Sequence, residues 1–241
     1  MQKATQFVVP ISLGVANVFA IRGKQGWILV DTGDVTQSKR LFTSLEQHGI
    51  AMRDIVLVVI THVHYDHVGN AALIRRKSVS TAIAVHEKEV SFLQTGQLLF
   101  PSGTGIFGRL LIGMSGFASR TFPDLFQYEP ANADIIIREE TSLVPFGIDG
   151  SIVLTPGHTI GSLSVLLDDG TIFVGDLVVN FFPWGGPVFP PFADDVPRLM
   201  ESWKNIMDRG ARLIYPGHGK SLPISKLQEV YEVRRQKLRL P

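Results

Sequence analysis

The residues with the clearest chemical potential lie in one short segment, 61–67 (THVHYDH), directly after the apolar run 55–60. Three imidazoles and a carboxylate this close together are poor core material and good metal-ligand material. The chain has seven histidines, and two more of them, His158 and His218, each end a Pro-Gly-His tripeptide that follows an apolar run. This distribution is typical of a metal site and not of scattered surface histidines.

The spacing within this segment predicts two metal positions. On an extended backbone, His62 and His64 point the same way, whereas Asp66 and His67 lie past a bend and face a second point. Two ions about 3.5–4 Å apart also need a bridging group. Asp176, at the end of the apolar run 171–174, suits that role.

The two Pro-Gly-His tripeptides are predicted to complete the site. In each, proline and glycine favour a tight turn that lifts the imidazole off a strand end. Seven nitrogen and oxygen ligands around two ions leave positions open for a water and a substrate oxygen. The predicted ligands are His62, His64, Asp66, His67, His158, Asp176 and His218.

Composition narrows the classes of protein. With 241 residues, 45% of them hydrophobic, the chain can bury a full core, and we expect one domain over residues 1–241. Its 23 basic and 22 acidic residues form no charged block, which predicts small-molecule partners and no nucleic acid. The absence of cysteine excludes thiolate ligands, disulfides and a cysteine nucleophile. The start of the chain has no apolar signal core and the apolar region 98–117 is interrupted, so no membrane span and a cytoplasmic location are expected.

Strand-like and helix-like runs occur in both halves of the chain. Residues 96–132 have no sustained period and are predicted to be an apolar insert or lid. The similarity of 27–31 (WILVD) to 171–176 (TIFVGD) hints at an internal repeat. The expected strands are 7–9, 18–21, 27–30, 55–60, 82–85, 151–155, 162–167, 171–174 and 213–215, with helices ending near Gly49, starting near Gly69 and Glu87, and spanning 195–208 and 225–238.

Five separated motifs together resemble the metallo-β-lactamase-fold hydrolase superfamily. They are DTG at 31–33, HVHYDH at 62–67, GHT at 157–159, GD at 175–176 and PGHG at 216–219, in the family's order over nearly the whole chain. The resemblance implies an α/β fold, a four-layer αββα sandwich.

The resemblance also implies a role for each motif residue. His62, His64 and His158 would hold the first metal, Asp66, His67 and His218 the second, and Asp176 would bridge them. Asp31 would lie beneath the ligands and orient them without being a ligand itself. Two divalent ions are expected, with zinc favoured and manganese, iron or cobalt as alternatives.

Departures from particular branches of the family narrow the activity. Asp176 stands where the best-known β-lactamases have cysteine, which argues against β-lactam hydrolysis and is similar to glyoxalase II-like thioesterases and acyl-homoserine lactonases. About 23 residues follow His218, too few for the helical domain of glyoxalase II. The lactonases usually have a tyrosine shortly after the aspartate, where this chain has 178–180 (VVN). The substrate therefore stays open.

The expected function is a dinuclear metal-dependent hydrolase that uses a metal-bound hydroxide on an ester, thioester or lactone of a small, partly apolar molecule. Asp66 is the candidate to hold or shuttle the proton. The alternatives are a phosphoester or phosphotriester hydrolase, a non-catalytic metal-binding sensor, and a mononuclear iron oxygenase similar to the family's persulfide dioxygenases.

The substrate pocket is predicted from aromatic residues beside the ligands. Phe181, Phe182 and Trp184 belong to a proline-rich loop, 181–192, and together with the insert they could form an apolar wall. The same surfaces could instead form a homodimer interface or pack in the core. His48 and His86 are assigned to helix ends and not to the site.

Overall fold

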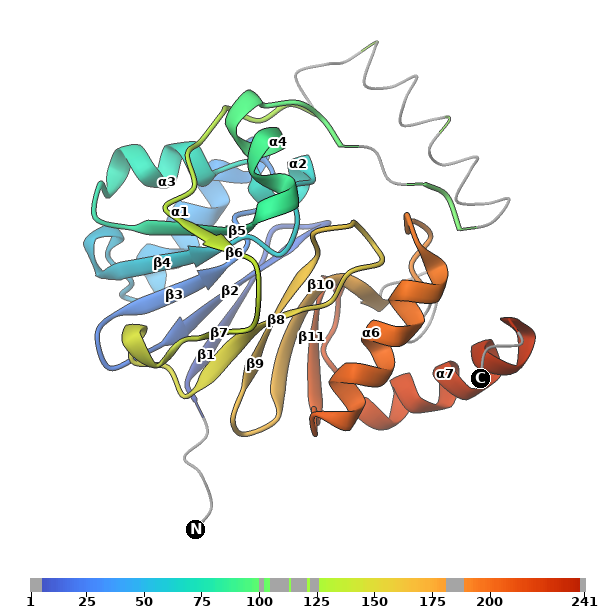
Figure 1. Cartoon of the computed structure of the whole chain (residues 1–241). Coiled ribbons are helices and arrows are strands. Elements are labelled where there is room, and N and C mark those ends of the chain that lie inside the picture. The colour runs from blue at the N-terminus through green and yellow to red at the C-terminus, as the bar shows by residue number, and fades with distance from the viewer. Residues whose placement is uncertain are drawn as a thin grey trace.

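The computed structural model describes residues 6–99, 102–104, 113, 121, 126–180 and 189–238. Two mixed six-stranded sheets lie at its centre (Figure 1). In spatial order, the first sheet contains β1 (Val8–Ser12), β2 (Asn17–Arg22), β3 (Trp27–Val30), β4 (Ile55–Val59), β5 (Ala82–His86) and β6 (Ile135–Ile137). The second contains β12 (Leu222–Pro223), β11 (Leu213–Gly219), β10 (Thr171–Asn180), β9 (Leu163–Leu167), β8 (Gly150–Leu154) and β7 (Thr141–Ser142).

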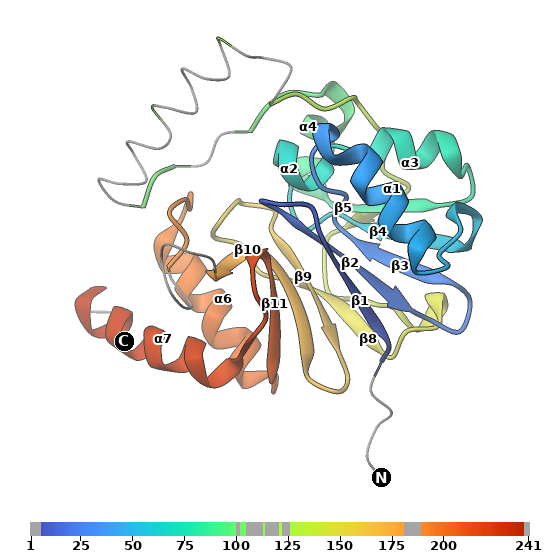
Figure 2. The ribbon, with the colours of Figure 1, turned by 180° about the vertical axis from the view of Figure 1, so that it is seen from behind.

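Helices cover the outer face of each sheet (Figures 1 and 2). The α-helices are α1 (Ser38–Gln47), α2 (Tyr65–Val68), α3 (Ala71–Lys77), α4 (Val90–Thr95), α6 (Val196–Asp208) and α7 (Ile224–Leu238), and short 3-10 helices lie at Val35–Gln37, Met52–Asp54, Glu87–Glu89 and Val144–Phe146. None of these helices in the described part of the chain is both long and apolar enough to span a membrane.

The two sheets pack face to face because their strands are apolar on both sides. In β3, Ile28 and Val30 belong to the core between the sheets, whereas Trp27 and Leu29 belong to the core under the helices. This alternation follows the two-residue period of a strand. Across the interface, the rings of Phe19 and Phe173 lie 5.1 Å apart.

Separate apolar cores join each sheet to its helices. Leu41 and Leu45 of α1 pack on the outer face of the first sheet, and Leu199 and Trp203 of α6 pack on that of the second. The Trp203 indole also donates a hydrogen bond to the carbonyl of Leu177 in β10, at 2.7 Å. Helix, sheet, sheet and helix therefore form four layers, and the expected αββα sandwich is confirmed.

The strands that carry Asp176 and His218 are longer than predicted. Asp176 was expected at the end of its strand, but β10 continues to Asn180, and β11 includes the whole Pro-Gly-His tripeptide. The reason is that β10 and β11 keep pairing in parallel beyond Gly175, where the register shifts, so that Val179 lies opposite His218. The expectation of a turn that lifts His218 off a strand end was therefore wrong. The tripeptide ending at His158 does form a turn.

Candidate metal centre

The seven predicted ligands converge from four segments of the chain. They lie after β4, in the connection from β8 to β9, in β10 and in β11. Their side chains form two groups, and within each group the possible ligand atoms lie within 4.8 Å of one another. The first group is His62, His64, His158 and Asp176, and the second is Asp66, His67 and His218.

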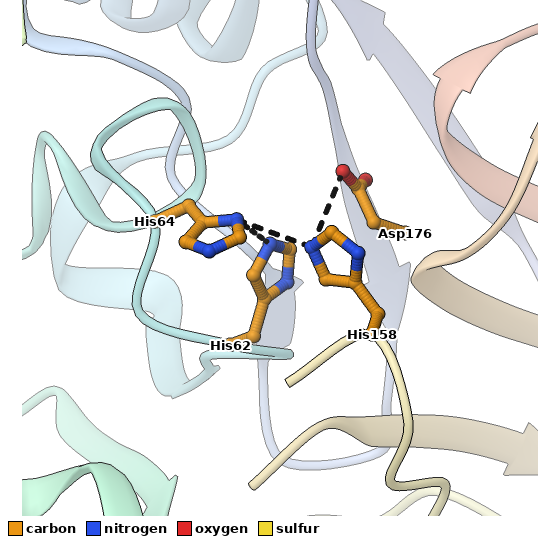
Figure 3. Close-up of side chains that lie close together, drawn as sticks. All are labelled: His62, His64, His158 and Asp176. Atoms are coloured by element: carbon orange, nitrogen blue, oxygen red, sulfur yellow. Dashed lines mark hydrogen bonds and ion pairs between the residues drawn. The ribbon is translucent and has the colours of Figure 1, made fainter. Parts of the chain in front are cut away.

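The donor atoms of the first group are spaced for one ion (Figure 3). His64 Nδ1 lies 2.9 Å from His62 Nε2 and 3.1 Å from His158 Nε2. His158 Nε2 lies 3.7 Å from Asp176 Oδ2. Four ligand atoms arranged tetrahedrally at zinc–nitrogen bond lengths are about 3.4 Å apart, so these separations fit a tetrahedral ion.

The second group has comparable spacings. His218 Nε2 lies 3.3 Å from Asp66 Oδ2 and 3.4 Å from His67 Nε2. His67 Nε2 lies 3.8 Å from Asp66 Oδ2. These three donors leave one side of a tetrahedron to be filled by another ligand.

Asp176 lies between the two groups. Its Oδ2 is 3.7 Å from His158 Nε2 in the first group and 3.3 Å from His218 Nε2 in the second. Its Oδ1 is 3.3 Å from His67 Nε2, is buried, and has no hydrogen-bond partner among the described residues. One carboxylate therefore faces both groups, as a bridging ligand must.

Hydrogen bonds at the far ring nitrogens aim the near nitrogens at the centre. His158 Nδ1 donates to the carbonyl of Phe192 at 2.9 Å, and His218 Nδ1 donates to that of Val15 at 2.8 Å. His67 Nδ1 lies 2.8 Å from a carboxylate oxygen of Asp31. In the neutral imidazole, each of these acceptors selects the tautomer with a lone pair on Nε2, the form that binds a metal.

His62 and His64 complete this pattern differently. His62 Nδ1 lies 3.0 Å from the hydroxyl of Thr61, which donates to Asp31 Oδ2 at 2.8 Å. His64 instead turns Nδ1 toward the other imidazoles, and its buried Nε2 has no hydrogen-bond partner within the described residues. Asp176 Oδ1 is thus a buried polar atom at the centre of the site, of the kind that a bound cation satisfies, whereas His64 Nε2 is the far nitrogen of its ring.

The imidazoles of the first group are neutral at pH 7. Burial lowers the pKa of His64 to about 3, and neighbouring histidines add to the effect. Burial and His67 hold the pKa of His62 well below its usual value. Burial also lowers the pKa of His158. Three ring lone pairs are thus available without loss of a proton.

The second group carries the opposite charge balance. Burial disfavours the charged form of His218 and His67, but Asp176 and the other nearby carboxylates favour it more strongly. As a result, the pKa of His218 is raised to about 10 and that of His67 lies well above its usual value. Burial likewise disfavours ionised Asp66, yet His67 and His218 lower its pKa to about 2. An ionised Asp66 suits a ligand better than a proton donor.

Asp31 occupies the position expected of it, beneath the ligands. It is buried, and besides His67 it accepts hydrogen bonds from the backbone N–H of Thr61 at 2.7 Å and from the Thr61 hydroxyl. Its φ of 62° is unusual for a residue other than glycine. The strained backbone aims its carboxylate at Thr61 and His67, near the two ends of the ligand-bearing segment 61–67.

Gly217 is needed for the close approach of the two sheets at the site. A Cβ at this position would lie 2.6 Å from His67 Cε1 and 2.7 Å from Asp176 Oδ1. Any side chain here would therefore displace ligand atoms, which explains the glycine in the Pro-Gly-His tripeptide.

The predicted substrate wall lies mostly outside the described residues. This applies to Phe181, Phe182 and Trp184 and to most of the insert at 96–132. Two described pieces of the insert do meet the site. The ring of Phe126 lies 5.1 Å from that of Tyr65, and residues 102–104 pair with 191–193, which include Phe192, the acceptor of His158.

Sequence reasoning missed residues that hold the ligand segments from behind. Asn17 donates to the carbonyls of Pro216 and Gly219, on either side of His218. Glu89 is fully buried and bonds to the segments of His62 and His158. A lone asparagine or a glutamate at a helix start has no distinguishing spacing. His48 and His86 do cap helix ends, as expected.

Comparison with known proteins gives a consistent family. The family model of the metallo-beta-lactamase superfamily matches residues 11–218. A probable metallo-hydrolase of Methanocaldococcus jannaschii is 31% identical over 211 residues, 85% of this chain and 88% of that protein. A human acyl-coenzyme A thioesterase is 25% identical over 228 residues, 88% of this chain and 76% of that protein.

Solved structures agree at the level of the fold. A protein crystallised in a di-iron-bound form has a TM-score of 0.64 at 21% identity, covering 92% of this chain and 96% of that one. Two buried groups of histidine and aspartate are typical of a dinuclear site on this fold. The family match, which spans most of the chain, shows that the protein belongs to the metallo-beta-lactamase superfamily.

Proposed function

We propose that the protein is a dinuclear metal-dependent hydrolase that cleaves an ester, thioester or lactone of a small, partly apolar molecule. The observation that carries this proposal is the position of Asp176 between two groups of donor atoms, within 3.7 Å of His158 and 3.3 Å of His218. Two bound ions supply Lewis acidity toward a carbonyl oxygen and an activated water.

The protein's own contribution is to hold the donors in place before any ion arrives. The far nitrogens of His158, His218 and His67 are fixed by acceptors, so little reorganisation is needed on binding. Zinc is the favoured ion. Iron is the second candidate, because a protein of similar fold has been crystallised in a di-iron-bound form.

The choice of a carbonyl substrate has two supports. One is the activity of the human relative, which is an acyl-coenzyme A thioesterase. The other is apolar surface close to the ligands. Tyr65, between two ligands in sequence, packs against Phe126 of the insert, and Phe192, whose carbonyl holds His158, is bridged to Gly103 of the insert. An acyl chain could lie along these segments.

The test combines metal analysis with a substrate panel. Protein purified without added metal is assayed for bound zinc, iron, manganese and cobalt. Each loaded form is then tested on carboxylic esters, on acyl thioesters of several chain lengths, on lactones, and on aryl phosphate mono- and triesters. We expect two ions per chain and hydrolysis of esters, thioesters or lactones.

Two results would contradict the proposal. Preferential turnover of the aryl phosphates would replace the carbonyl substrate with a phosphoester. Full loading without hydrolysis of any member of the panel would favour a metal-binding sensor. His64→Ala is the matched loss-of-ligand variant, and it should lose both an ion and any measured turnover.

A further inference from the structure

Glu89 is a fully buried carboxylate behind the metal centre that the proposed chemistry does not use. It ends the short helix Glu87–Glu89, has 0% exposure, and lies on the first sheet's side of the site. Burial raises the pKa of its carboxyl to about 7, against which three hydrogen bonds act. A buried group this costly is retained where its hydrogen bonds matter.

The three donors come from the two segments that carry the histidines of the first group. Oε2 accepts from the backbone N–H of Val63 at 2.5 Å, and Val63 lies between His62 and His64. Oε1 accepts from the hydroxyl of Thr159, the residue after His158. The backbone N–H of Gly161 is the third donor.

The local packing leaves Glu89 little freedom to move. A Cβ at Gly161 would lie 2.7 Å from Glu89 Cγ and 2.9 Å from both Cδ and Oε1. The Thr159 hydroxyl is held in turn by Ser162, whose oxygen lies 2.8 Å away and also accepts from the Thr159 N–H at 3.0 Å. The carboxylate is thus seated in a backbone cradle that only glycine permits.

We infer that Glu89 is a positioning residue that sets the distance between the His62–His64 pair and His158, and thereby the affinity of the first group for its ion. The inference rests on the proposed metal site. It predicts a selective effect, because within the described residues no hydrogen bond of Glu89 reaches α2, which carries Asp66 and His67, or β11, which carries His218.

Selectivity can be measured by reducing the site to one group at a time. In the full-length chain, His218→Ala leaves the first group and His64→Ala leaves the second. Metal is removed with a chelator, and Co²⁺ is titrated back by its visible absorption and by competition with a chromogenic chelator. Loss of an outer hydrogen-bond partner typically costs about 10–100-fold in metal affinity.

We expect Glu89→Ala to weaken Co²⁺ binding by about 10–100-fold in the His218→Ala background and to change its absorption bands. In the His64→Ala background the affinity should stay within about twofold. Glu89→Gln keeps the shape and one acceptor oxygen, so an intermediate loss is expected. Tyr128→Phe is the control, since its hydroxyl donates to the nearby carbonyls of Phe92 and Gln97 and, within the described residues, forms no hydrogen bond to a ligand-bearing segment.

Gly161→Ala provides a variant that keeps the carboxylate and moves it. It should weaken the first group when Glu89 is present and add little once Glu89 is alanine, because the clash is then relieved. This variant also decides the question if Glu89→Ala fails to fold.

Three results would overturn the inference. The first is an unchanged affinity of the first group in Glu89→Ala and Gly161→Ala, and the second is an equal loss in both backgrounds. The third, a wild-type chain that binds no Co²⁺ at all, would overturn the proposed function as well, and so is distinguishable from the other two.

Discussion

The two donor groups of the metal centre use the same kinds of ligand and differ in charge. The first offers three imidazoles that burial keeps neutral. The second contains two imidazoles that nearby carboxylates keep protonated. In the metal-free protein, protons on His67 and His218 therefore occupy the place of a cation in the second group, whereas the first group has its lone pairs free.

This difference in charge predicts that the two groups bind their ions with different affinities. An ion entering the first group displaces no proton, but one entering the second must compete with two. The hydrogen-bond supports differ as well. His67 is held by the Asp31 carboxylate, while His62 is held only indirectly through the Thr61 hydroxyl.

Replacement of Asp176, which faces both groups, should weaken metal binding in both of them. Asp176→Asn keeps the shape of the side chain and removes its charge. The metal affinity of both groups should fall by more than about a hundredfold, which exceeds the loss expected when only a hydrogen-bond partner of a ligand is removed. Hydrolysis should fall by at least as much. Elemental analysis after dialysis measures the ions, and Glu46→Gln, on the exposed face of α1, controls for the lost charge. Loss of a single ion would show that Asp176 serves one group only.

Two outer variants should separate the groups. Asp31→Asn tolerates the positive φ of this position and removes the anionic acceptor of His67, so the second group should weaken by about 10–100-fold. The first group should weaken less, because Asp31 reaches His62 only through the Thr61 hydroxyl. Thr61→Val removes the acceptor of His62 at nearly constant volume and should act mainly on the first group. Competition with a chelator measures both, and each variant is the control for the other. Identical effects of the two variants would contradict the assignment.

The two groups of candidate ligands were predictable because their residue types are rare and closely spaced. The αββα layers were predictable because five separated motifs resemble those of the superfamily. The extent of β10 and β11 was not, since parallel pairing beyond Gly175 depends on a neighbouring strand some 40 residues away in sequence. Glu89 and Asn17 bond to backbone atoms of remote segments, which produces no periodic signal.

The pH dependence of metal affinity should also differ between the two groups. Because His218 has a pKa of about 10 and that of His67 is also raised, the affinity of the second group should rise by up to about tenfold per pH unit for each proton displaced between pH 7 and 9. The first group, in which His64 titrates near pH 3, should change little. Titrations of the single-group variants at pH 7, 8 and 9 measure this, and equal slopes would contradict the charge comparison.

The smallest expected effect is on the stability of the metal-free protein. A group whose pKa is raised in the folded state stabilises the fold fully at pH values below its ordinary pKa. This stability is lost as the pH rises through the pKa of the folded state. For His218 the loss occurs between pH 6.5 and about 10. A lowered pKa acts in reverse, so the cost of burying His64 grows as the pH falls from 6.5 toward about 3. Metal-free protein should therefore melt highest near neutral pH and lower at pH 5 and pH 9, with each kcal/mol shifting the midpoint by about 2–4 °C. Zinc should remove the alkaline decrease, because the ion replaces the protons and binds only the folded state. A metal-free midpoint that is higher at pH 9 than at pH 7 would show that protons do not stand in for a cation in the second group.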